Sequence, residues 1–295
     1  GFECKCLFCK FSAQLPTIRF LIDKLMEGIM TLKVTQFTET IWHQDGGVVT
    51  LSLNRPEKRN AINSLMLAEL IFALELCADD DSVRVVVIKG TEKGFCPGDD
   101  LSGMGELSAE ILSTLQHPVT HAALQSCLRD LPKPTIAAIH GFAFGVGLDL
   151  AMACDFRIAQ VDARLQDQRV IERGMHAVTG CAWFQPRAIG LTRALEFLIL
   201  GKAFSGEEAA EFGMVTMAVA ESELEQSVAE MSNRLANAPT KAIGLMKKQI
   251  YEGLNLNHSD FMDFAAPLIN EINIEDRKEG IAAFLEKRAP KFTGR

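Results

Sequence analysis

Runs of β-branched and small apolar residues that each end in a turn constrain this chain more than any other feature. The runs are VVTLSL at 48–53, VRVVVIK at 83–89 and TIAAIH at 135–140, and the last two stop at Gly90 and Gly141. Uninterrupted apolar runs are typical of strands that are buried on both faces of a sheet. Because such strands need helices to cover them, the pattern predicts an α/β fold.

The spacing of apolar residues between these runs predicts helices. From 62 to 77 the apolar residues recur on one helical face, and either Asn60 or Asn63 can cap the start of this helix. Residues 191–230 combine helical stretches with three glycines, which are typical of helix ends. We therefore expect strands that alternate with helices along most of the chain.

Three regions are expected along the chain. Residues 1–29 differ from the rest in composition, and Met30 opens a cleaner segment, so we expect 1–29 to be a disordered or non-native leader. Residues 30–235 are expected to form the core. Residues 236–295 have an amphipathic pattern, and we expect them to form a C-terminal helical region.

Composition and charge exclude several classes of protein. The chain has 295 residues, of which 48% are apolar and 23% charged, and this balance excludes a disordered chain. The net charge of −8 argues against a broad nucleic-acid surface, which needs clustered lysine and arginine. No apolar run reaches the roughly 18 residues that a membrane-spanning helix needs. We therefore expect neither a nucleic-acid nor a membrane partner.

The eight cysteines indicate a reducing compartment. Five of them are scattered through apolar stretches without a paired rhythm, which is typical of reduced, intracellular thiols. Cys4, Cys6 and Cys9 cluster near the start but lack the fourth ligand of a structural zinc site, so no metal is expected. We expect a cytoplasmic protein, or a mitochondrial or peroxisomal one in a eukaryote.

Two glycine-containing loops, at 94–98 and 141–147, follow buried strands and are suited to chemistry. Glycines let the backbone turn sharply and let a ligand approach closely. A helix predicted to begin near Leu148 directs amide dipoles toward the second loop. If each loop offers one N–H to the same oxygen, the two form an oxyanion hole. A dinucleotide site fits less well, because the G-x-G-x-x-G pattern lacks its third glycine and there is no Walker lysine.

Five segments in order carry a family resemblance. They are LNRPEKRNAIN (53–63), FCPGDDL (95–101), LPKPTIAAIHGFAFGVGLDLAMACD (131–155), LGKAFSGEEAAEFGMV (200–215) and EDRKEGIAAFLEKR (275–288). Through them the chain resembles the crotonase superfamily, the enoyl-CoA hydratase/isomerase group. The resemblance implies a spiral of ββα units with a C-terminal helical trimerisation region, assembled as a homotrimer or a dimer of trimers. It also implies an acyl-CoA thioester as substrate, with no cofactor beyond the CoA that the substrate carries.

The resemblance also implies site residues. The main-chain amides of Asp99 and Val146 would donate to the thioester oxygen, and Asp149 would be the main acid/base group. Phe284 and Lys287 could reach the CoA of a neighbouring subunit. The substrate groove would be lined by Lys58, Asn60, Ala61, Ile62, Gly98, Asp100, Leu101, Met104, Gly141, Phe142 and Gly145.

The sequence departs from the family pattern at its acidic residues. The pattern has two glutamates, and Asp149 stands at the first of them. One residue count puts Arg169 at the second, and another count puts Val170 there. Glu172 is the nearest carboxylate: either a local register change brings it into the site, or it is a solvated surface residue. Some relatives use an aspartate further on, but that position is Val178 here.

Other residues near the site carry expectations of their own. The helix start should keep Asp149 ionised, which suits a base. Val146 replaces the usual glycine at the second amide, and a β-branched residue resists positive φ. The carboxylate of Asp99 would repel an oxyanion unless it points away. His176 titrates near neutrality and is either functional or structural.

Two functions are consistent with these residues. The first is an acyl-CoA enzyme of the enoyl-CoA hydratase/isomerase type, which stabilises a thioester enolate in the oxyanion hole. The alternative is a catalytically impaired acyl-CoA binding or scaffold protein with the same fold, and the missing second glutamate motivates it. RNA binding is reported for some proteins that this chain resembles, but the net charge of −8 disfavours it. We favour the enzyme because both glycine loops and Asp149 are present.

Overall fold

The computed structural model describes residues 37–271 and 274–294. Residues Thr38–Arg295 form one compact unit. The expected leader at 1–29, including its three cysteines, lies outside the described residues. The expected boundary near residue 235 stays a prediction.

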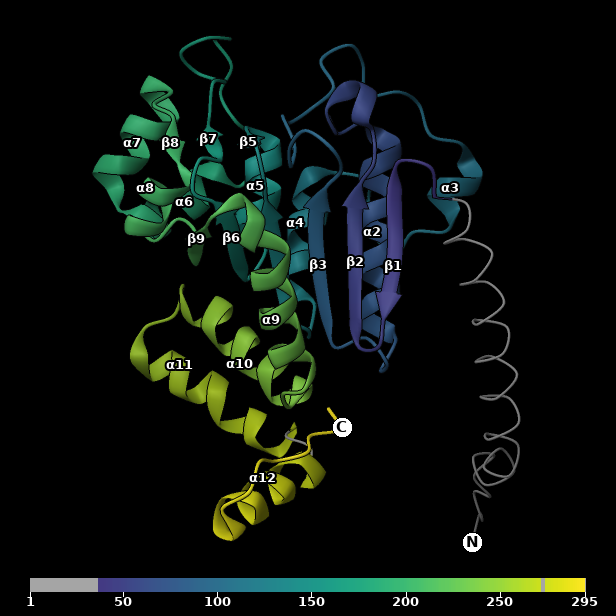
Figure 1. Ribbon diagram of the computed structural model, residues 1–295, viewed down its shortest axis with the longest axis vertical. Coiled ribbons are helices and arrows are strands. Elements are labelled where there is room, and N and C mark those ends of the chain that lie inside the picture. The colour runs from purple at the N-terminus through teal and green to yellow at the C-terminus, as the bar shows by residue number, and fades with distance from the viewer. Residues whose placement is uncertain (1–36, 272–273, 295) are drawn as a thin grey trace, which may run out of the picture. The chain divides into compact units, whose positions relative to one another are not determined.

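A six-stranded sheet forms the centre of this unit, in the order β1-β2-β3-β4-β6-β9 (Figure 1). β1 and β2 pair antiparallel, and every other pair of neighbours is parallel. The strands are β1 (Thr40–Asp45), β2 (Val48–Leu53), β3 (Val85–Gly90), β4 (Thr135–Ile139), β6 (Phe156–Gln160) and β9 (Met217–Val219). The three strands predicted from the sequence are confirmed as β2, β3 and β4.

Helices cover both faces of this sheet (Figure 1). On one face α9 packs through Leu224 and Val228 against Val85, Val87 and Ile136, and α2 contacts β1 and β2 on the other. The α-helices are α2 (Ser64–Asp79), α3 (Ala109–Ser113), α4 (His121–Asp130), α5 (Val146–Ala153), α6 (Cys181–Ile189), α7 (Leu191–Leu200), α8 (Gly206–Glu211), α9 (Leu224–Ala236), α10 (Thr240–Gly253), α11 (His258–Ala265) and α12 (Ile274–Glu286). Short 3₁₀ helices lie at Pro56–Lys58, Glu221–Glu223 and Ala266–Glu271. The predicted α/β fold is confirmed.

The two predicted helix caps have different roles. The side-chain oxygen of Asn63 accepts a hydrogen bond from the amide of Met66 at 2.9 Å, so Asn63 caps α2. Asn60 is fully buried, and its side-chain nitrogen donates to the carbonyls of Thr91 and Gly94, each at 2.9 Å. Asn60 therefore ties the segment before α2 to the first glycine loop.

A second, three-stranded sheet begins at the second glycine loop. It contains β5 (Phe142–Phe144), β7 (Arg164–Gln166) and β8 (Phe204–Ser205), in the order β5-β7-β8. Gly141 separates β4 from β5 with a φ of +61°, and a Cβ there would lie 2.5 Å from the carbonyl oxygen of Lys93. Only glycine fits this position, where the chain leaves one sheet and enters the other beside the first loop.

The helices predicted beyond Asn237 are present as α10, α11 and α12. Lys247 of α10 is buried, and its ammonium group donates to the carbonyl of Leu128 at 2.7 Å and to the carboxylate of Asp155 at 2.9 Å. Since a buried cation is stable only when it is paired and hydrogen-bonded, these contacts hold α10 against the core.

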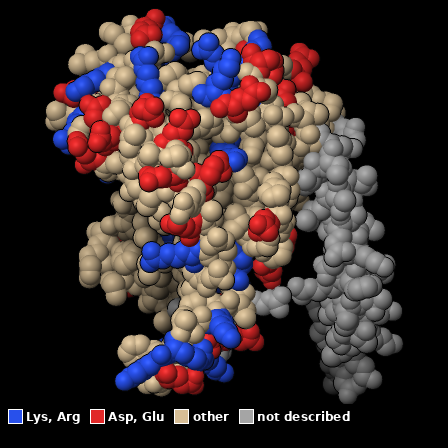
Figure 2. All heavy atoms as spheres, viewed as in Figure 1, with Lys and Arg blue, Asp and Glu red and all other residues tan. Residues whose placement is uncertain are grey.

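The surface in Figure 2 mixes acidic and basic side chains over much of the visible face. Basic side chains gather more densely at the C-terminal end of the molecule in this view. Among the described residues, no helix combines the length and the apolar character that crossing a bilayer requires. The five described cysteines are free thiols.

Candidate active site

The first glycine loop is held by backbone bonds to the residues just before α2. The amide of Ile62 donates to the carbonyl of Gly98 at 2.8 Å, and the amide of Asp100 donates to the carbonyl of Ile62 at 2.8 Å. Asp99 lies between these two bonds in a parallel bridge with Ile62, so its own N–H faces the opposite side. Within the described part of the chain, the Asp99 amide donates to no acceptor.

The second glycine loop leads directly into α5. Gly145 has a φ of +48°, and its amide donates to the carbonyl of Gln166 at 3.1 Å. Val146 is the first residue of α5, and first-turn amides have no acceptor inside their own helix. The positive φ falls on Gly145 and not on Val146, so the strain expected at this β-branched residue does not arise.

The two loops touch each other. A Cβ on Gly98, which has a φ of +104°, would lie 3.2 Å from the carbonyl oxygen of Phe144 and 3.4 Å from the amide nitrogen of Val146. A cavity of about 70 Å³ lies at this contact. It is lined by Pro97, Gly98, Asp99, Leu101, Gly145, Val146, Arg169, Arg173 and Met175. Both predicted donor residues line the same cavity, and the binding of one oxygen by both amides stays a prediction.

Asp149 is fully buried in the first turn of α5. Its Oδ2 accepts a hydrogen bond from the hydroxyl of Thr179 and lies 3.0 Å from Nη2 of Arg169. Its Oδ1 is buried and has no hydrogen-bond partner among the described residues. One oxygen of this carboxylate is therefore fixed by neighbours, and the other has no hydrogen-bond partner among the described residues.

Arg169 lies between two aspartates. Its Nε donates to Oδ1 of Asp167 at 2.9 Å, and its Nη1 donates to the hydroxyl oxygen of Thr179 at 2.6 Å. Of the two residues that the sequence counts put at the second acidic position, Arg169 is thus the one that reaches Asp149. A cation contacts Asp149 from the position where the family pattern has a second carboxylate.

Burial has the largest effect on the pKa of Asp149. Loss of solvation raises the pKa of this carboxyl above its ordinary value, and the charge of Arg169 and the hydrogen bond from Thr179 lower it by less. This direction is opposite to the effect expected from the helix start, and the ionisation of Asp149 stays a prediction. Burial lowers the pKa of Arg169, but Asp167 and Asp149 more than offset this and raise it, so Arg169 keeps its charge.

The other residues considered for an acidic role do not reach Asp149. Glu172 is exposed, and in the described structure its side chain has no hydrogen bond or ion pair. The side chain of Val178 is 85% exposed. His176 is exposed and lines a separate cavity of about 370 Å³ together with Asp167, Arg169 and apolar residues of α6 and α7.

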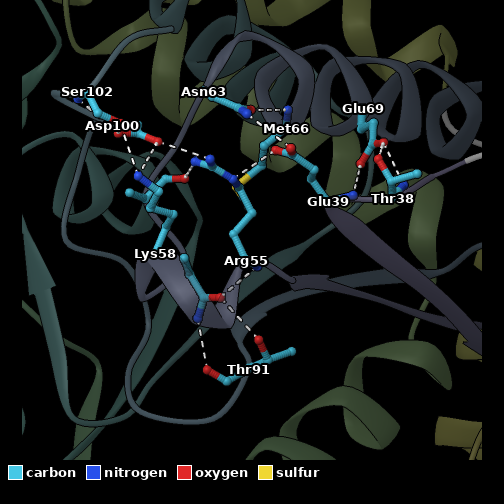
Figure 3. A network of polar contacts seen from close by, with 12 residues as sticks. Thr38, Glu39, Arg55, Lys58, Asn63, Met66, Glu69, Thr91, Asp100 and Ser102 are labelled. Carbon is cyan, nitrogen blue, oxygen red and sulfur yellow. Dashed lines mark hydrogen bonds and ion pairs between the residues drawn. The ribbon is translucent and has the colours of Figure 1, made fainter. Parts of the chain in front are cut away.

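A polar network lies beside the predicted CoA groove (Figure 3). Arg55 pairs with Glu39 at 3.2 Å and with Asp100 at 3.0 Å. Asp100 also accepts hydrogen bonds from the hydroxyl and the amide of Ser102, and these with Arg55 lower the pKa of Asp100 to about 2. Asp100 therefore stays ionised and fixes the end of the first glycine loop, while Lys58 donates to the hydroxyl of Ser102 at 3.1 Å.

The remaining groove residues differ in what they can offer a ligand. Leu101 is 73% exposed and lines the small cavity. Ala61 and Ile62 are buried, and their amides and carbonyls already take part in hydrogen bonds within the chain. The carbonyl of Met104 accepts a hydrogen bond from the amide of Ser64 at 2.8 Å, and the ring of Phe142 stacks on Phe144 with ring centroids 5.2 Å apart.

The C-terminal residues of the sequence prediction lie on α12 and just beyond it. Phe284 is 82% exposed and lines an apolar groove with Ile281 and Leu285. Lys287 is exposed and has a positive φ of 54°. Their contact with the CoA of a neighbouring subunit stays a prediction.

Sequence reasoning missed two partners of the site. Thr179 binds Asp149 from 30 positions away, and nothing in the local sequence marks it. His121 has its Nε2 2.9 Å from Oδ1 of Asp99. The only sequence signal for such a partner was the unusual carboxylate at position 99.

Comparison with known proteins gives consistent matches. The family model described as enoyl-CoA hydratase/isomerase matches residues 43–295. The chain is 34% identical over 260 residues to 1,2-epoxyphenylacetyl-CoA isomerase of Escherichia coli (strain K12), covering 86% of this chain and 97% of that protein. It is 36% identical over 258 residues to the mouse mitochondrial protein named enoyl-CoA hydratase domain-containing protein 2, covering 84% of this chain and 85% of that one.

A solved structure matches the fold over nearly the same span. The enoyl-CoA hydratase from Bacillus anthracis superposes with a TM-score of 0.77 at 30% identity, covering 88% of this chain and 100% of that chain. The similarity therefore includes both glycine loops, the segment around Arg169 and the C-terminal helices.

Proposed function

The chain belongs to the enoyl-CoA hydratase/isomerase family and has its crotonase fold, as the sequence resemblance predicted, and we propose that it is an acyl-CoA isomerase that moves a proton with Asp149. It is an enzyme of this family. The proposal concerns its substrate, an acyl-CoA thioester, the reaction that it performs and the residues that perform it.

The proposed oxyanion hole consists of the amides of Asp99 and Val146. Removing a proton beside a thioester carbonyl moves negative charge onto the carbonyl oxygen. Two fixed N–H groups stabilise that charge without reorganising, and one such donor typically contributes about 2.7–4 kcal/mol to transition-state stabilisation. The contact between the two loops at Gly98 and the lack of other acceptors for both amides among the described residues support this role.

The observation that carries the proposal is that the two oxygens of the Asp149 carboxylate differ in their partners. Thr179 and Arg169 hold Oδ2, and Oδ1 is buried and unpartnered among the described residues. In the proposed reaction, Oδ1 takes a proton from one carbon of the acyl group, which leaves an enolate. The same oxygen then returns that proton to another carbon, so the double bond moves and Asp149 recovers its first state. Because burial raises its pKa, Asp149 is a stronger base than an ordinary aspartate and can also return the proton.

The position of Arg169 favours isomerisation over hydration. Hydration in the family pattern uses two carboxylates that flank a water molecule, and a guanidinium ion cannot take a proton from water. Transfer of a proton between two carbons requires only one carboxylate. The scaffold alternative has the same support from Arg169, but it gives no reason for a buried Asp149 with one free oxygen.

The cavity of about 370 Å³ supports an apolar acyl group. It shares Asp167 and Arg169 with the site, and its apolar lining includes Val170, Ala177, Leu191, Ala194, Leu195, Leu198 and Ile199. We expect KM to fall as the acyl chain lengthens from four to about ten carbons, because each buried CH₂ contributes about 0.8 kcal/mol. Kinetics on a chain-length series measure this directly.

Assembly, cofactor and location are further parts of the proposal. Ile281, Phe284 and Leu285 of α12 are each more than half exposed, and this apolar surface supports a homotrimer or a dimer of trimers. We propose that no cofactor takes part, since amides and a carboxylate supply the chemistry. A cytoplasmic location, or a mitochondrial or peroxisomal one in a eukaryote, stays a prediction.

The test is Asp149→Asn assayed with 3-enoyl-CoA and 2-enoyl-CoA substrates. The change keeps the size of the side chain and removes its ability to carry the proton, so we expect kcat to fall by about 10²–10⁴-fold while CoA binding persists. Asp162→Asn, at an exposed turn position, is the matched control and should keep full activity. Full activity of Asp149→Asn would remove Asp149 from the mechanism. CoA binding by the wild type without turnover of any acyl-CoA would favour the scaffold.

A further inference from the structure

Asp99, the first proposed oxyanion donor, has a carboxylate side chain that would repel the oxyanion bound by its own amide. Asp99 is proposed to donate its main-chain N–H to an oxygen that becomes negative, and its carboxylate lies on the same residue. The side chain is 32% exposed, so bulk water does not fully screen it. Two like charges that water does not fully screen repel each other. A bare carboxylate here would oppose the reaction.

The structure supplies a partner for this charge. Nε2 of His121, the first residue of α4, lies 2.9 Å from Oδ1 of Asp99, and the His121 side chain is 20% exposed. This contact places the imidazole ring directly against the carboxylate. Among the described residues, His121 is the one basic side chain within 4.0 Å of this carboxylate.

Neither of the two side chains forms a further ion pair among the described residues. The Asp99–His121 contact lacks the angles of a hydrogen bond, and neither Oδ1 of Asp99 nor Nδ1 of His121 has a hydrogen-bond partner among the described residues. The next acidic residue, Asp100, is already paired with Arg55 and does not compete for the imidazole. The Asp99 carboxylate therefore lies on the side of the loop that faces α4.

We propose that His121 is a positioning residue for the proposed oxyanion hole: it holds the Asp99 carboxylate toward α4 and so keeps this carboxylate away from the thioester oxygen. The inference rests on the proposed function. It explains how a carboxylate is tolerated at the donor position. It also assigns a role to a histidine that takes no part in proton transfer.

The test is a rescue experiment. His121→Gln removes the imidazole that contacts the carboxylate, and we expect kcat to fall by about 10- to 100-fold with CoA affinity unchanged. Adding Asp99→Asn removes the unbalanced carboxylate, so the double variant should recover to within about threefold of wild type. A purely structural role for His121 would give no such recovery. The inference is overturned if His121→Gln keeps its kcat, or if the second change fails to restore it.

His117 provides the matched control. It lies four residues before the start of α4. Its Nδ1 is 2.8 Å from the carboxylate of Glu75, away from both glycine loops. His117→Gln makes the same chemical change to a histidine–carboxylate pair, and its kcat should equal that of wild type. An equal loss in His117→Gln and His121→Gln would overturn the inference. Thermal unfolding of each variant reports whether it folds, and His121→Asn is the second variant if His121→Gln does not.

A spectroscopic measurement separates this inference from the proposed function. Acetoacetyl-CoA is the probe, because it has no carbon–carbon double bond to move and its enolate absorbs in the near ultraviolet. We expect the enolate band of the bound analogue to weaken in His121→Gln and to return in the double variant. If the band follows this order while Asp149→Asn keeps full turnover, the role of His121 stands and the proton transfer by Asp149 fails. If Asp149→Asn is inactive and the band is the same in all variants, only the role of His121 fails.

Discussion

The two sides of Asp149 respond differently to changes in sequence. On one side, the proposed contacts to a substrate come from the backbone of the two glycine loops, and any residue except proline can supply an N–H. Valine at 146 and aspartate at 99 therefore leave the loop geometry intact. On the other side, residues 167–179 act through side chains, and one arginine changes the chemistry that is available. A backbone site tolerates substitution, and a side-chain site is redefined by it.

The largest effect is expected for a substitution among the side chains of residues 167–179. Arg169→Met leaves Asp149 and Asp167 buried close together without their cation. We expect the free energy of unfolding to fall by about 3–5 kcal/mol, because a buried charge loses its partner. Urea denaturation followed by circular dichroism measures the change. Arg173→Met is the control, since Arg173 is exposed and donates only to Gln168, at 3.2 Å. Equal stability of the two variants would contradict the account.

The next largest effect is expected for a substitution in the two glycine loops. Gly98→Ala adds a Cβ at a φ of +104°, which L residues rarely adopt, and places it 3.2 Å from the carbonyl oxygen of Phe144, so the contact between the loops must shift by a few tenths of an ångström. We expect kcat to fall by about 10²–10³-fold, the loss typical of one oxyanion donor. In the control, Gly46→Ala, the residue also has a positive φ, but nothing lies within 4 Å of the new Cβ. Steady-state kinetics compare the two, and the same modest loss in both would mean that the contact between the loops is unimportant.

A smaller effect is expected where Thr179 links Arg169 to Asp149. Its hydroxyl lowers the pKa of Asp149, so Thr179→Val raises that pKa further. Because the deprotonated carboxylate is the base, the acidic limb of kcat/KM should move to higher pH and activity below this limb should be lost. We expect kcat to fall about tenfold, in line with one hydrogen bond to a charged group. Thr179→Ser keeps the hydroxyl and should keep the wild-type pH profile. An unshifted acidic limb of kcat/KM in Thr179→Val would show that the Thr179 hydroxyl does not affect the pKa of Asp149.

The smallest effect is expected at the rim of the CoA groove. Lys58 is 45% exposed, so its contribution to binding a CoA phosphate is screened. We expect Lys58→Ala to raise KM about two- to fivefold with kcat unchanged, and added salt to reduce the difference. Lys202→Ala is the control, because Lys202 pairs with Glu196 on α7. A change in kcat would show that Lys58 does more than bind the substrate.

The sequence was sufficient for features that depend on local residues. The apolar runs predict β2, β3 and β4 because burial on both faces of a sheet demands such runs. The two glycine loops are visible because Gly98 and Gly141 occupy conformations that other residues avoid. The order of five family motifs then led to the correct family.

The sequence was insufficient where distant segments meet. The contact between Asp149 and Thr179 depends on how the chain returns after β7, which no local pattern records. The same return brings Arg169 to the site and leaves Glu172 at the surface. The helix dipole could be predicted from the sequence, but the full burial that raises the pKa of Asp149 could not.

A crystal structure of the wild-type protein with bound acetoacetyl-CoA tests the central claim most directly. The account predicts a thioester oxygen about 2.7–3.1 Å from the amide nitrogens of both Asp99 and Val146, with Oδ1 of Asp149 facing the carbon beside the carbonyl. A thioester oxygen that instead lies against Arg169 or in solvent, with either amide unused, would contradict it.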